Sequence, residues 1–246
     1  DLIFGLPFQT ETDIEQTILE TVKMRPDRIS FYSYAHTPWL KENGQRGFNE
    51  KDVPEAATKR RHYNMGKKIL LEAGYLEIGI DHFALPEDTL TRAAQQGRLH
   101  RNFMGYTTSG TQTTIGLGVS AISDACTGLG QNVKGLEEYH SLINNDILPI
   151  YRGHILTTED EVIRKHILNL MCQFHTSWKS QETEPSQLTA ILQRLREMEK
   201  DDLMYIGEKF LQITPAGRAF VRNACMAFDQ YIHGGIADKK AFSMII

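Results

Sequence analysis

The beginning of the chain alternates short apolar runs with a helical repeat of apolar residues. The run "DLIF" (residues 1–4) stops before turn-forming residues, which is typical of a buried parallel strand. Apolar residues then recur every four positions over 14–22, and the spacing of Thr10 and Asp13 fits a capping box that begins this helix. The β-forming stretch 28–35 predicts a second strand. Strand, helix and strand within about 35 residues form a βαβ unit, so we expect a parallel pair with a right-handed crossover.

After the second predicted strand the pattern becomes more polar. Residues 36–52 predict a polar loop, Pro54 opens a second helix that Gly74 ends as a C-cap glycine, and "YLEIGI" (75–80) predicts a third strand. The next segment, 81–110, has few core-forming residues, but too little Gly, Ser and Pro for a flexible spacer. We therefore expect a long ordered loop that presents functional side chains at the C-terminal end of a strand, where α/β proteins bind ligands.

Helical patterns dominate after the stretch "TTIGLGVSAIS" (113–123), which itself predicts a strand. We place a domain boundary near residue 150, so that residues 1–150 form an α/β domain and residues 151–246 a small helical domain with a hairpin, like a winged helix. The later elements that the pattern predicts are helices over 136–145, 158–173 (with a capping box from Thr158 to Glu161) and 187–200, a polar connection over 176–187, short apolar strands over 203–206 and 210–213, and a last helix that begins at Pro215 and is capped by Thr214.

Composition narrows the class of protein without identifying it. The chain has 246 residues, a net charge of −4 and 41% hydrophobic residues, which suits one large or two small globular domains and does not favour a nucleic-acid partner. No apolar stretch reaches the ~18 residues of a membrane span, and the start lacks the basic region of a signal peptide. Because the chain has no starting Met and opens inside a predicted strand, we expect it to be a fragment.

The three cysteines, Cys126, Cys172 and Cys225, are far apart and form no CxxC or CxxxCxxC spacing. Isolated cysteines in odd number are typical of reduced thiols in a cytoplasmic protein. Their spacing predicts no metal or iron–sulfur site, so we expect no metal ligands in this chain.

Two charged pairs carry candidate chemistry, and each has a structural alternative. Asp81 and His82 directly follow a predicted strand and fit an acid–base pair, a metal ligand or a hydrogen-bonded structural histidine. His100 and Arg101 fit either an ordinary surface pair or a carboxylate site, since a guanidinium binds a carboxylate through a fork of N–H donors.

Three further patterns have weaker functional interpretations. Gly116-x-Gly118 fits either a strand that passes close to a neighbour or a backbone surface for a nucleoside. The basic helix face at 59–68 is typical of a solvated surface. A DNA-binding winged helix over 187–232 is disfavoured, because its recognition helix would be acidic at its end and phosphate binding needs a basic surface.

Several segments are uninformative one by one but indicate a family when they are considered together. They are "DLIFGLP", "PDRISFYSYAH", "GYLEIGIDHFALPEDTL", "LHRNFMGYTT", "GLGVSAIS" and "ITPAGRAFVRNACMAFDQY". In this order, and over essentially the whole chain, they resemble the oxygen-independent coproporphyrinogen III oxidase family. The pair "DHFA" (81–84) and "HRNFMGYTT" (100–108) is the specific part, since related radical SAM proteins that bind or transfer haem share the early strand–helix portion and lack this pair.

The resemblance implies a fold of the α/β plus α class: the end of a partial (βα)6 radical SAM barrel, followed by a mostly helical, winged-helix-like C-terminal domain. It implies an oxidoreductase of haem synthesis that uses S-adenosylmethionine and a [4Fe–4S] cluster to generate a radical, which takes a hydrogen from the β-carbon of a propionate. Carbon dioxide leaves, an electron passes to an acceptor that the resemblance does not identify, and a vinyl group remains. Two of the four propionates of coproporphyrinogen III react in this way without oxygen, which gives protoporphyrinogen IX.

The resemblance also implies cofactor contacts at five positions. Asp1 and Ala35 match contacts to a second S-adenosylmethionine, and a carboxylate suits that cationic ligand. Ile122 matches a backbone contact to the first S-adenosylmethionine, and Ile3 and Phe103 line its surroundings. No catalytic residue is carried over.

Charge, rather than the family's motifs, indicates three contacts to the tetrapyrrole substrate. His82, His100 and Arg101 are the candidates for meeting its propionates. The family's cluster motif, CxxxCxxC, is expected upstream of Asp1, so we expect this chain by itself to bind no cluster and to be inactive, and its leading strand to be an unpaired sheet edge. The alternatives are a non-enzymatic haem-binding or haem-delivery relative, a DNA-binding module, and a folding unit without a ligand.

Overall fold

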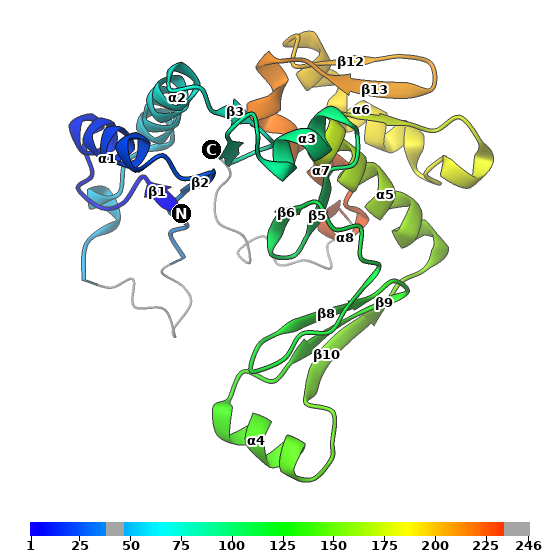
Figure 1. Cartoon of the computed structure of the whole chain (residues 1–246). Helices are drawn as coiled ribbons and strands as arrows, with labels where there is room; N and C mark the ends of the chain where they lie inside the picture. The colour runs from blue at the N-terminus through cyan, green and yellow to red at the C-terminus, as the bar shows by residue number, and fades with distance from the viewer. Residues whose placement is uncertain (38–46, 234–246) are drawn as a thin grey trace.

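The computed structural model describes residues 1–37 and 47–233 and has three parts (Figure 1). A four-stranded sheet with helices forms the first part, a second sheet tipped by a helix projects from the body, and a helical part with a three-stranded sheet follows. The predicted polar loop 36–52 lies partly outside the described residues; a 3-10 turn, Glu50–Asp52, ends it. Within the described part, no helix is long and apolar enough to cross a membrane.

The chain opens with the predicted βαβ unit. It consists of β1 (Leu2–Phe4), α1 (Glu11–Met24) and β2 (Arg28–Ser33), and β1 and β2 are parallel. The predicted capping box begins α1: the Thr10 hydroxyl accepts from the Asp13 N–H at 3.2 Å, and Asp13 Oδ2 accepts from the Thr10 N–H at 2.8 Å. As predicted, β1 lies at the edge of its sheet.

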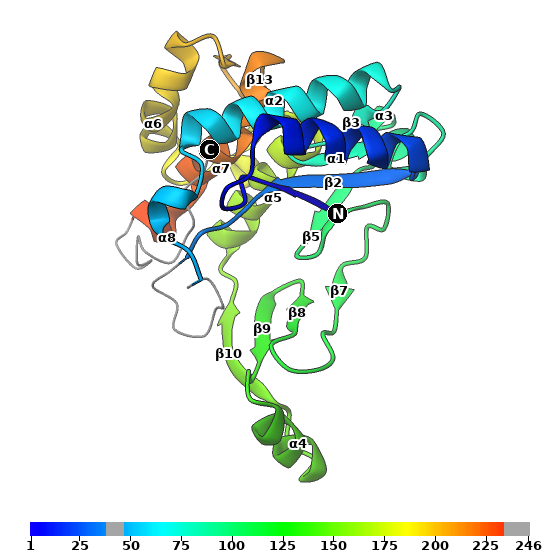
Figure 2. The same ribbon diagram turned by 90° about the vertical axis from the view of Figure 1, so that its left-hand side faces the viewer.

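Helices α1 and α2 (Ala56–Glu72) lie side by side on one face of this sheet (Figure 2). Gly74 follows α2 with φ +91°, a left-handed conformation that favours glycine, so the predicted helix end is confirmed. The apolar side chains of the helices and the sheet form one core, which consists of Phe4, Ile14, Ile18, Ile29, Phe31, Tyr63, Leu70, Tyr75, Phe83 and Leu85.

The prediction of a third strand over 75–80 is wrong. Only β3 (Leu76–Glu77) forms, and the chain then reverses into β4 (His82–Ala84), which is antiparallel to both β3 and β2. The strand order is β1-β2-β4-β3. The reversal passes through Gly79, where a Cβ would lie 2.2 Å from the Tyr106 ring, so the turn needs a residue without a side chain.

The prediction of a long loop over 81–110 is also wrong. After β4 the segment forms α3 (Thr89–Gln95) and a hairpin of β5 (His100–Asn102) and β6 (Gly105–Thr107). Most of its few apolar residues pack into a second core, separate from that of the first sheet and its helices. This core contains Ile78, Ala84, Leu90, Ala93, Leu99, Tyr106 and Cys172.

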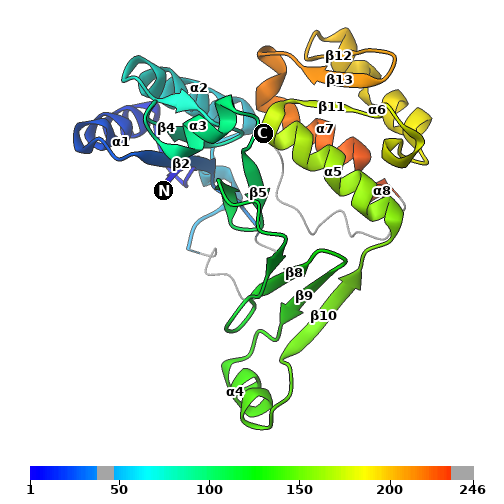
Figure 3. The ribbon, with the colours of Figure 1, turned by 45° about the vertical axis from the view of Figure 1, so that its right-hand side comes forward.

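Residues 113–155 form a separate sheet, here named the arm, with α4 (Leu136–Asn144) at its far end (Figures 1 and 3). The predicted strand 113–123 is wrong, since Gly118 turns the chain with φ +98°. Gly116 packs so closely that a Cβ would lie 2.6 Å from the Ile122 carbonyl oxygen, which supports the structural interpretation of this motif. The strands are β7 (Thr113–Thr114), β8 (Ile122–Ala125), β9 (Gly128–Asn132) and β10 (Ile150–Ile155), in the order β10-β9-β8-β7, and the pattern did not predict β9 and β10.

The remaining residues form a helical bundle against a small sheet. The domain boundary at 150 stays a prediction, and β10 crosses it. The capping box of the first helix is Thr157 with Asp160, one residue before the predicted pair. The predicted last helix does not begin at Pro215, since Ala216–Phe220 form a 3-10 turn and the α-helix begins at Val221. The Thr214 hydroxyl accepts from the Gly217 N–H at 3.1 Å, at the start of this turn. The elements are α5 (Thr158–Gln173), β11 (His175–Ser177), α6 (Leu188–Lys200), β12 (Met204–Ile206), β13 (Phe210–Ile213), α7 (Val221–Phe228) and α8 (Gln230–His233), with 3-10 turns at Gln181–Thr183 and Ala216–Phe220.

Candidate functional site

A cavity of about 820 Å³ opens beside the C-terminal ends of β1 and β2. This is the edge of a parallel strand pair at which α/β proteins bind ligands, and the volume lies within the range of about 300–1,000 Å³ of small-molecule sites. Its wall combines strand ends, the turn before β4, the hairpin, α5 and α7. Examples from each, in chain order, are Phe4, Ser33, Ala35, Asp81, Arg101, Met171 and Arg222.

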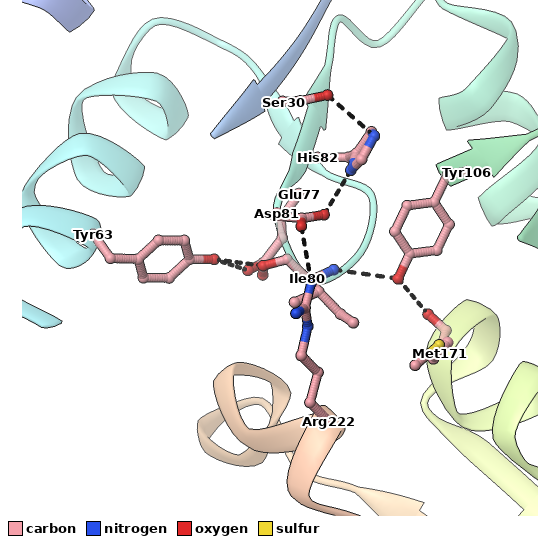
Figure 4. Close-up of polar contacts among 9 residues, drawn as sticks. All are labelled: Ser30, Tyr63, Glu77, Ile80, Asp81, His82, Tyr106, Met171 and Arg222. Carbon is pink, nitrogen blue, oxygen red and sulfur yellow. Dashed lines mark hydrogen bonds and ion pairs between the residues drawn. The ribbon is translucent and has the colours of Figure 1, made fainter. Parts of the chain in front are cut away.

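Asp81 is the centre of a polar network in this wall (Figure 4). The residue is 9% exposed, at the turn between β3 and β4. His82 Nδ1 lies 2.7 Å from Asp81 Oδ1, and His82 Nε2 lies 3.1 Å from the Ser30 hydroxyl. From α7, Arg222 Nη2 donates to Asp81 Oδ2 at 3.2 Å. The network thus joins the sheet to a helix near the other end of the chain.

The neighbours of Asp81 keep it ionised. Burial alone would raise the pKa of this carboxyl, but the contact with His82 and the positive charges of Arg101 and Arg222 together lower the pKa below its ordinary value of 3.8. A buried carboxylate in this state holds cationic side chains in place.

Arg101 presents a positive charge that the described residues do not fully satisfy. Its guanidinium carbon lies 4.7 Å from the centroid of the Tyr106 ring, a cation–π contact. Its Nη1 is buried and has no hydrogen-bond partner among the described residues. A buried donor without a partner is costly, so this part of the wall favours a ligand with an acceptor, above all an anion.

Tyr106 is the platform on which Arg101 rests. Its hydroxyl donates to the Met171 carbonyl at 2.9 Å and accepts from the Ile80 N–H at 3.3 Å (Figure 4). Burial raises the pKa of Tyr106, so the phenol stays protonated. Gly79 leaves the space that the ring fills. The Arg101 guanidinium therefore lies over a fixed surface.

The charges of the cavity wall favour an anionic ligand. Arg60, Arg101 and Arg222 line it, against Asp81 and Asp229. Asp229 Oδ1 accepts from two backbone N–H groups of α8, those of Tyr231 at 2.9 Å and Ile232 at 3.2 Å, so part of its charge is already engaged.

The structure brings only some of the predicted substrate residues to the cavity. Arg101 lines it. His82 lies behind the wall with both ring nitrogens in hydrogen-bond contact, which supports the structural interpretation of this histidine over a metal ligand. His100 pairs with Thr107 in the hairpin and is not part of the lining.

Of the five predicted cofactor residues, only one lines the cavity. Ala35 lines the cavity, immediately beyond β2. Asp1 is exposed, and Ile3 and Phe103 are 39% and 78% exposed, so these three are open to a ligand outside the lining described above. Ile122 begins β8 in the arm and is half-buried.

Sequence reasoning missed Arg222 as a site residue. It is the one charged residue of α7, in the segment "VRNACMAF". The only signal in the sequence is that Arg222 is the lone charge of a helix whose other residues, apart from Asn223, are apolar, and this composition does not show what the helix borders.

The described cysteines do not fit an iron–sulfur cluster. No group of three His, Cys, Asp or Glu side chains that could hold a metal comes together in the described ranges. Burial raises the pKa of Cys172 to about 11 and that of Cys225 to about 12, whereas a metal ligand is a thiolate. That the ligands of the cluster lie upstream of Asp1 stays a prediction.

The chain is similar to proteins of one kind, although no family model matches it. It is 39% identical to the oxygen-independent coproporphyrinogen III oxidase of Salmonella typhimurium over 100% of its own length and 54% of that protein. It is 37% identical to the protein of the same name from Thermostichus vulcanus, over 94% of its own length and 73% of that protein. The chain spans about half the length of most of these curated relatives.

The fold agrees with these likenesses. The structure of coproporphyrinogen III oxidase from Escherichia coli, described as a radical SAM enzyme, superimposes with a TM-score of 0.87 at 37% identity, over 94% of this chain and 54% of the other. The described fold is therefore that of part of a radical SAM enzyme. More narrowly, the chain belongs to the oxygen-independent coproporphyrinogen III oxidase family, which confirms the family that its sequence motifs resemble.

Proposed function

We propose that the full-length protein of which this chain is a part converts two propionates of coproporphyrinogen III into vinyl groups without oxygen, which gives protoporphyrinogen IX. The family supports the reaction. The observation that carries the substrate class is the buried, unpartnered Nη1 of Arg101 in the wall of an anion-favouring cavity. A tetrapyrrole with four propionates supplies the acceptor that this donor lacks.

In this proposal the residues of the chain bind and orient rather than react. Arg101 receives a propionate carboxylate, and Tyr106 keeps the guanidinium in position. Apolar wall residues such as Phe4 and Met171 meet the macrocycle. S-adenosylmethionine, when bound and reduced, supplies the radical that takes a hydrogen from the β-carbon of the propionate. Fixing the carboxylate fixes which carbon faces that radical.

Asp1, Ala35, Ile122, Ile3 and Phe103 are the proposed contacts to S-adenosylmethionine. The carboxylate of Asp1 suits its cationic part, and the exposed apolar side chains of Ile3 and Phe103 suit its nucleoside. Since the described cysteines do not fit a [4Fe–4S] cluster, we propose that residues 1–246 alone do not turn over substrate.

The finer parts of the fold prediction belong to the same proposal. We propose that the first part completes a (βα)6 barrel in the full-length protein, that residues 151–246 form a winged-helix-like domain, and that the protein works in the cytoplasm without a nucleic-acid partner. Helix α6 followed by the β12–β13 hairpin supports the winged-helix assignment.

The test uses the full-length protein, reconstituted anaerobically with its cluster. We expect coproporphyrinogen III and S-adenosylmethionine, supplied with a low-potential one-electron reductant and a one-electron acceptor, to yield protoporphyrinogen IX and two molecules of carbon dioxide, measured by chromatography of the oxidised porphyrins and by trapped gas. Arg101→Ala should raise KM about tenfold or more, since a charge-assisted hydrogen bond is lost. No vinyl product from the wild type would reject the reaction, and an unchanged KM in Arg101→Ala would reject the carboxylate assignment.

The haem-binding alternative has no comparable support among the described residues. A histidine-ligated haem would need an imidazole nitrogen open to the cavity; no histidine of the described residues lines it, and His82 behind the wall has both nitrogens in hydrogen-bond contact. Haem binding by the wild type with a histidine-ligated absorption spectrum, together with no turnover, would favour that alternative.

A further inference from the structure

Helix α7 brings a second arginine to the cavity, 121 positions after Arg101 in the sequence (222 − 101). Arg222 lines the cavity, and its side chain is 45% exposed, so it borders the open space rather than the core. Its Nη2 donates to Asp81 Oδ2. Figure 4 shows the side chain rising from its helix toward the turn at Asp81.

The ion pair with Asp81 orients Arg222 without using all of its donors. A guanidinium carries five N–H groups in a planar fork, and the contact to Asp81 engages one nitrogen. Asp81 is itself held by His82, which contacts Ser30 on β2. The sheet therefore determines the direction of a side chain that α7 supplies.

Both arginines have guanidinium donors that could bind the same ligand. Arg101 has a buried Nη1 without a partner in the described structure, while Arg222 has further donors beside its single carboxylate contact. Both arginines line the cavity together with Asp81, and the charge of each lowers the pKa of that carboxyl. One ligand carboxylate has two oxygens and accepts from both.

We propose that Arg222 is a specificity-determining residue that binds a carboxylate of the substrate together with Arg101, and that Asp81 positions it. This inference rests on the proposed function and adds that α7 contributes to recognition. Two ligands of that reaction carry carboxylates, the tetrapyrrole and S-adenosylmethionine. The apolar wall around the arginines fits the tetrapyrrole, so we assign the contact to a propionate.

The test measures the binding of coproporphyrin III to the full-length protein by fluorescence titration. Arg222→Ala should weaken binding about tenfold to a hundredfold, and Arg222→Lys should weaken it less, because the charge remains and the fork is lost. Arg196→Ala is the matched control, since this arginine of α6 is exposed and pairs with Glu199 outside the cavity. The control should bind like the wild type.

A second ligand separates recognition from a structural role. The tetra-amide of the same porphyrin has no carboxylate, so its affinity should be equal for the wild type and Arg222→Ala. A general loss of structure would lower both affinities. If Arg222→Ala fails to fold because Asp81 loses its partner, the double variant Asp81→Asn, Arg222→Ala removes that carboxylate as well and should show the same selective loss.

The outcomes distinguish this inference from the proposed function. If the wild type neither binds coproporphyrin III nor forms vinyl product, the proposed function fails. If the wild type does both and Arg222→Ala binds coproporphyrin III as the control does, only the inference fails. A variant that loses affinity for S-adenosylmethionine while its porphyrin affinity stays unchanged would also overturn the assignment.

Discussion

Asp81 and Asp160 are both buried aspartates in contact with a histidine, yet their surroundings differ in kind. Asp160 accepts five hydrogen bonds, three at Oδ2 from the Thr157 N–H, the Thr157 hydroxyl and His154, and two at Oδ1 from Gln230 and Tyr231. Asp81 has two side-chain contacts, one of them to an arginine at the edge of a cavity. Both carboxylate oxygens of Asp160 are thus engaged by donors of the protein. The surroundings of Asp81 include Arg101, whose Nη1 has no partner among the described residues.

This difference shows which feature separates a structural cluster from a binding site. Burial would raise the pKa of either carboxyl, and hydrogen bonds or charges lower it in both cases. A lowered pKa and a neighbouring histidine are thus shared by both places. Of the two aspartates, only Asp81 lies in the wall of the cavity, where it neighbours the partly exposed Arg222 and Arg101, whose buried Nη1 has no partner among the described residues. This combination predicts a ligand.

The largest expected effect is that of Asp160→Ala, which tests the structural side of the comparison. The change removes the carboxylate half of the capping box at the start of α5, while the N-cap residue Thr157 stays, and leaves several partly buried donors without an acceptor. We expect the free energy of unfolding to fall by about 3 kcal/mol in urea denaturation. Porphyrin affinity of the folded protein should not change. If the folded variant bound porphyrin more weakly than the wild type, Asp160 would belong to the binding site and would no longer differ from Asp81 in this respect.

The second largest expected effect is that of Gly79→Ala, which tests whether the Tyr106 ring is needed to hold Arg101 at the ligand site. A Cβ at this position lies 2.2 Å from the Tyr106 ring, so the ring that supports Arg101 must move. We expect a loss of stability of about 2 kcal/mol and weaker porphyrin binding. Gly110→Ala is the control, since nothing lies within 4 Å of its added Cβ. Equal behaviour of the two variants would show that the Tyr106 platform is not needed.

The smallest effect extends the comparison to two buried histidines. His62 is buried without a hydrogen-bond partner for either ring nitrogen among the described residues, whereas His166 contacts the Thr176 hydroxyl at 2.6 Å and the Thr183 carbonyl at 2.8 Å. We expect His62→Leu to stabilise the protein by about 1 kcal/mol at pH 7.5 and His166→Leu to destabilise it.

The same pair predicts a pH dependence. Burial lowers the pKa of His62 below its ordinary value of 6.5, so the unfolded chain binds the proton more readily. Stability should therefore fall as the pH drops from 6.5 toward the folded-state pKa, and His62→Leu should flatten this slope in urea denaturation at pH 7.5 and 5.5. An unchanged slope would mean that His62 is protonated in the folded protein.

Elements with local signals were predictable from the sequence. The capping box at Thr10, the four-residue period that follows it and the glycine at 74 are all properties of neighbouring residues, and α1, β2 and α2 form where the pattern indicates. The reversal at Gly79 depends instead on the ring of Tyr106, whose hydroxyl bonds to Met171, 65 positions away. No local pattern contains that contact.

For the same reason, the sequence predicted only some of the residues of the candidate site. Charge type marked Arg101, and it does line the cavity. His82 looked equivalent from sequence but faces Asp81 and Ser30, because β4 runs antiparallel and turns the ring toward β2. Arg222 joins the site only through the packing of α7 against α5, which the composition of either helix does not reveal.

The bond between Asp81 and Arg222 spans 141 positions of the chain. During synthesis from the N-terminus, the acidic turn exists long before its cationic partner leaves the ribosome. A chain released early would bury an aspartate with one charge missing from its surroundings and would lack one side of the ligand site. Once α7 is in place, a bound anion would link the first sheet to this helix and raise the stability of both at once.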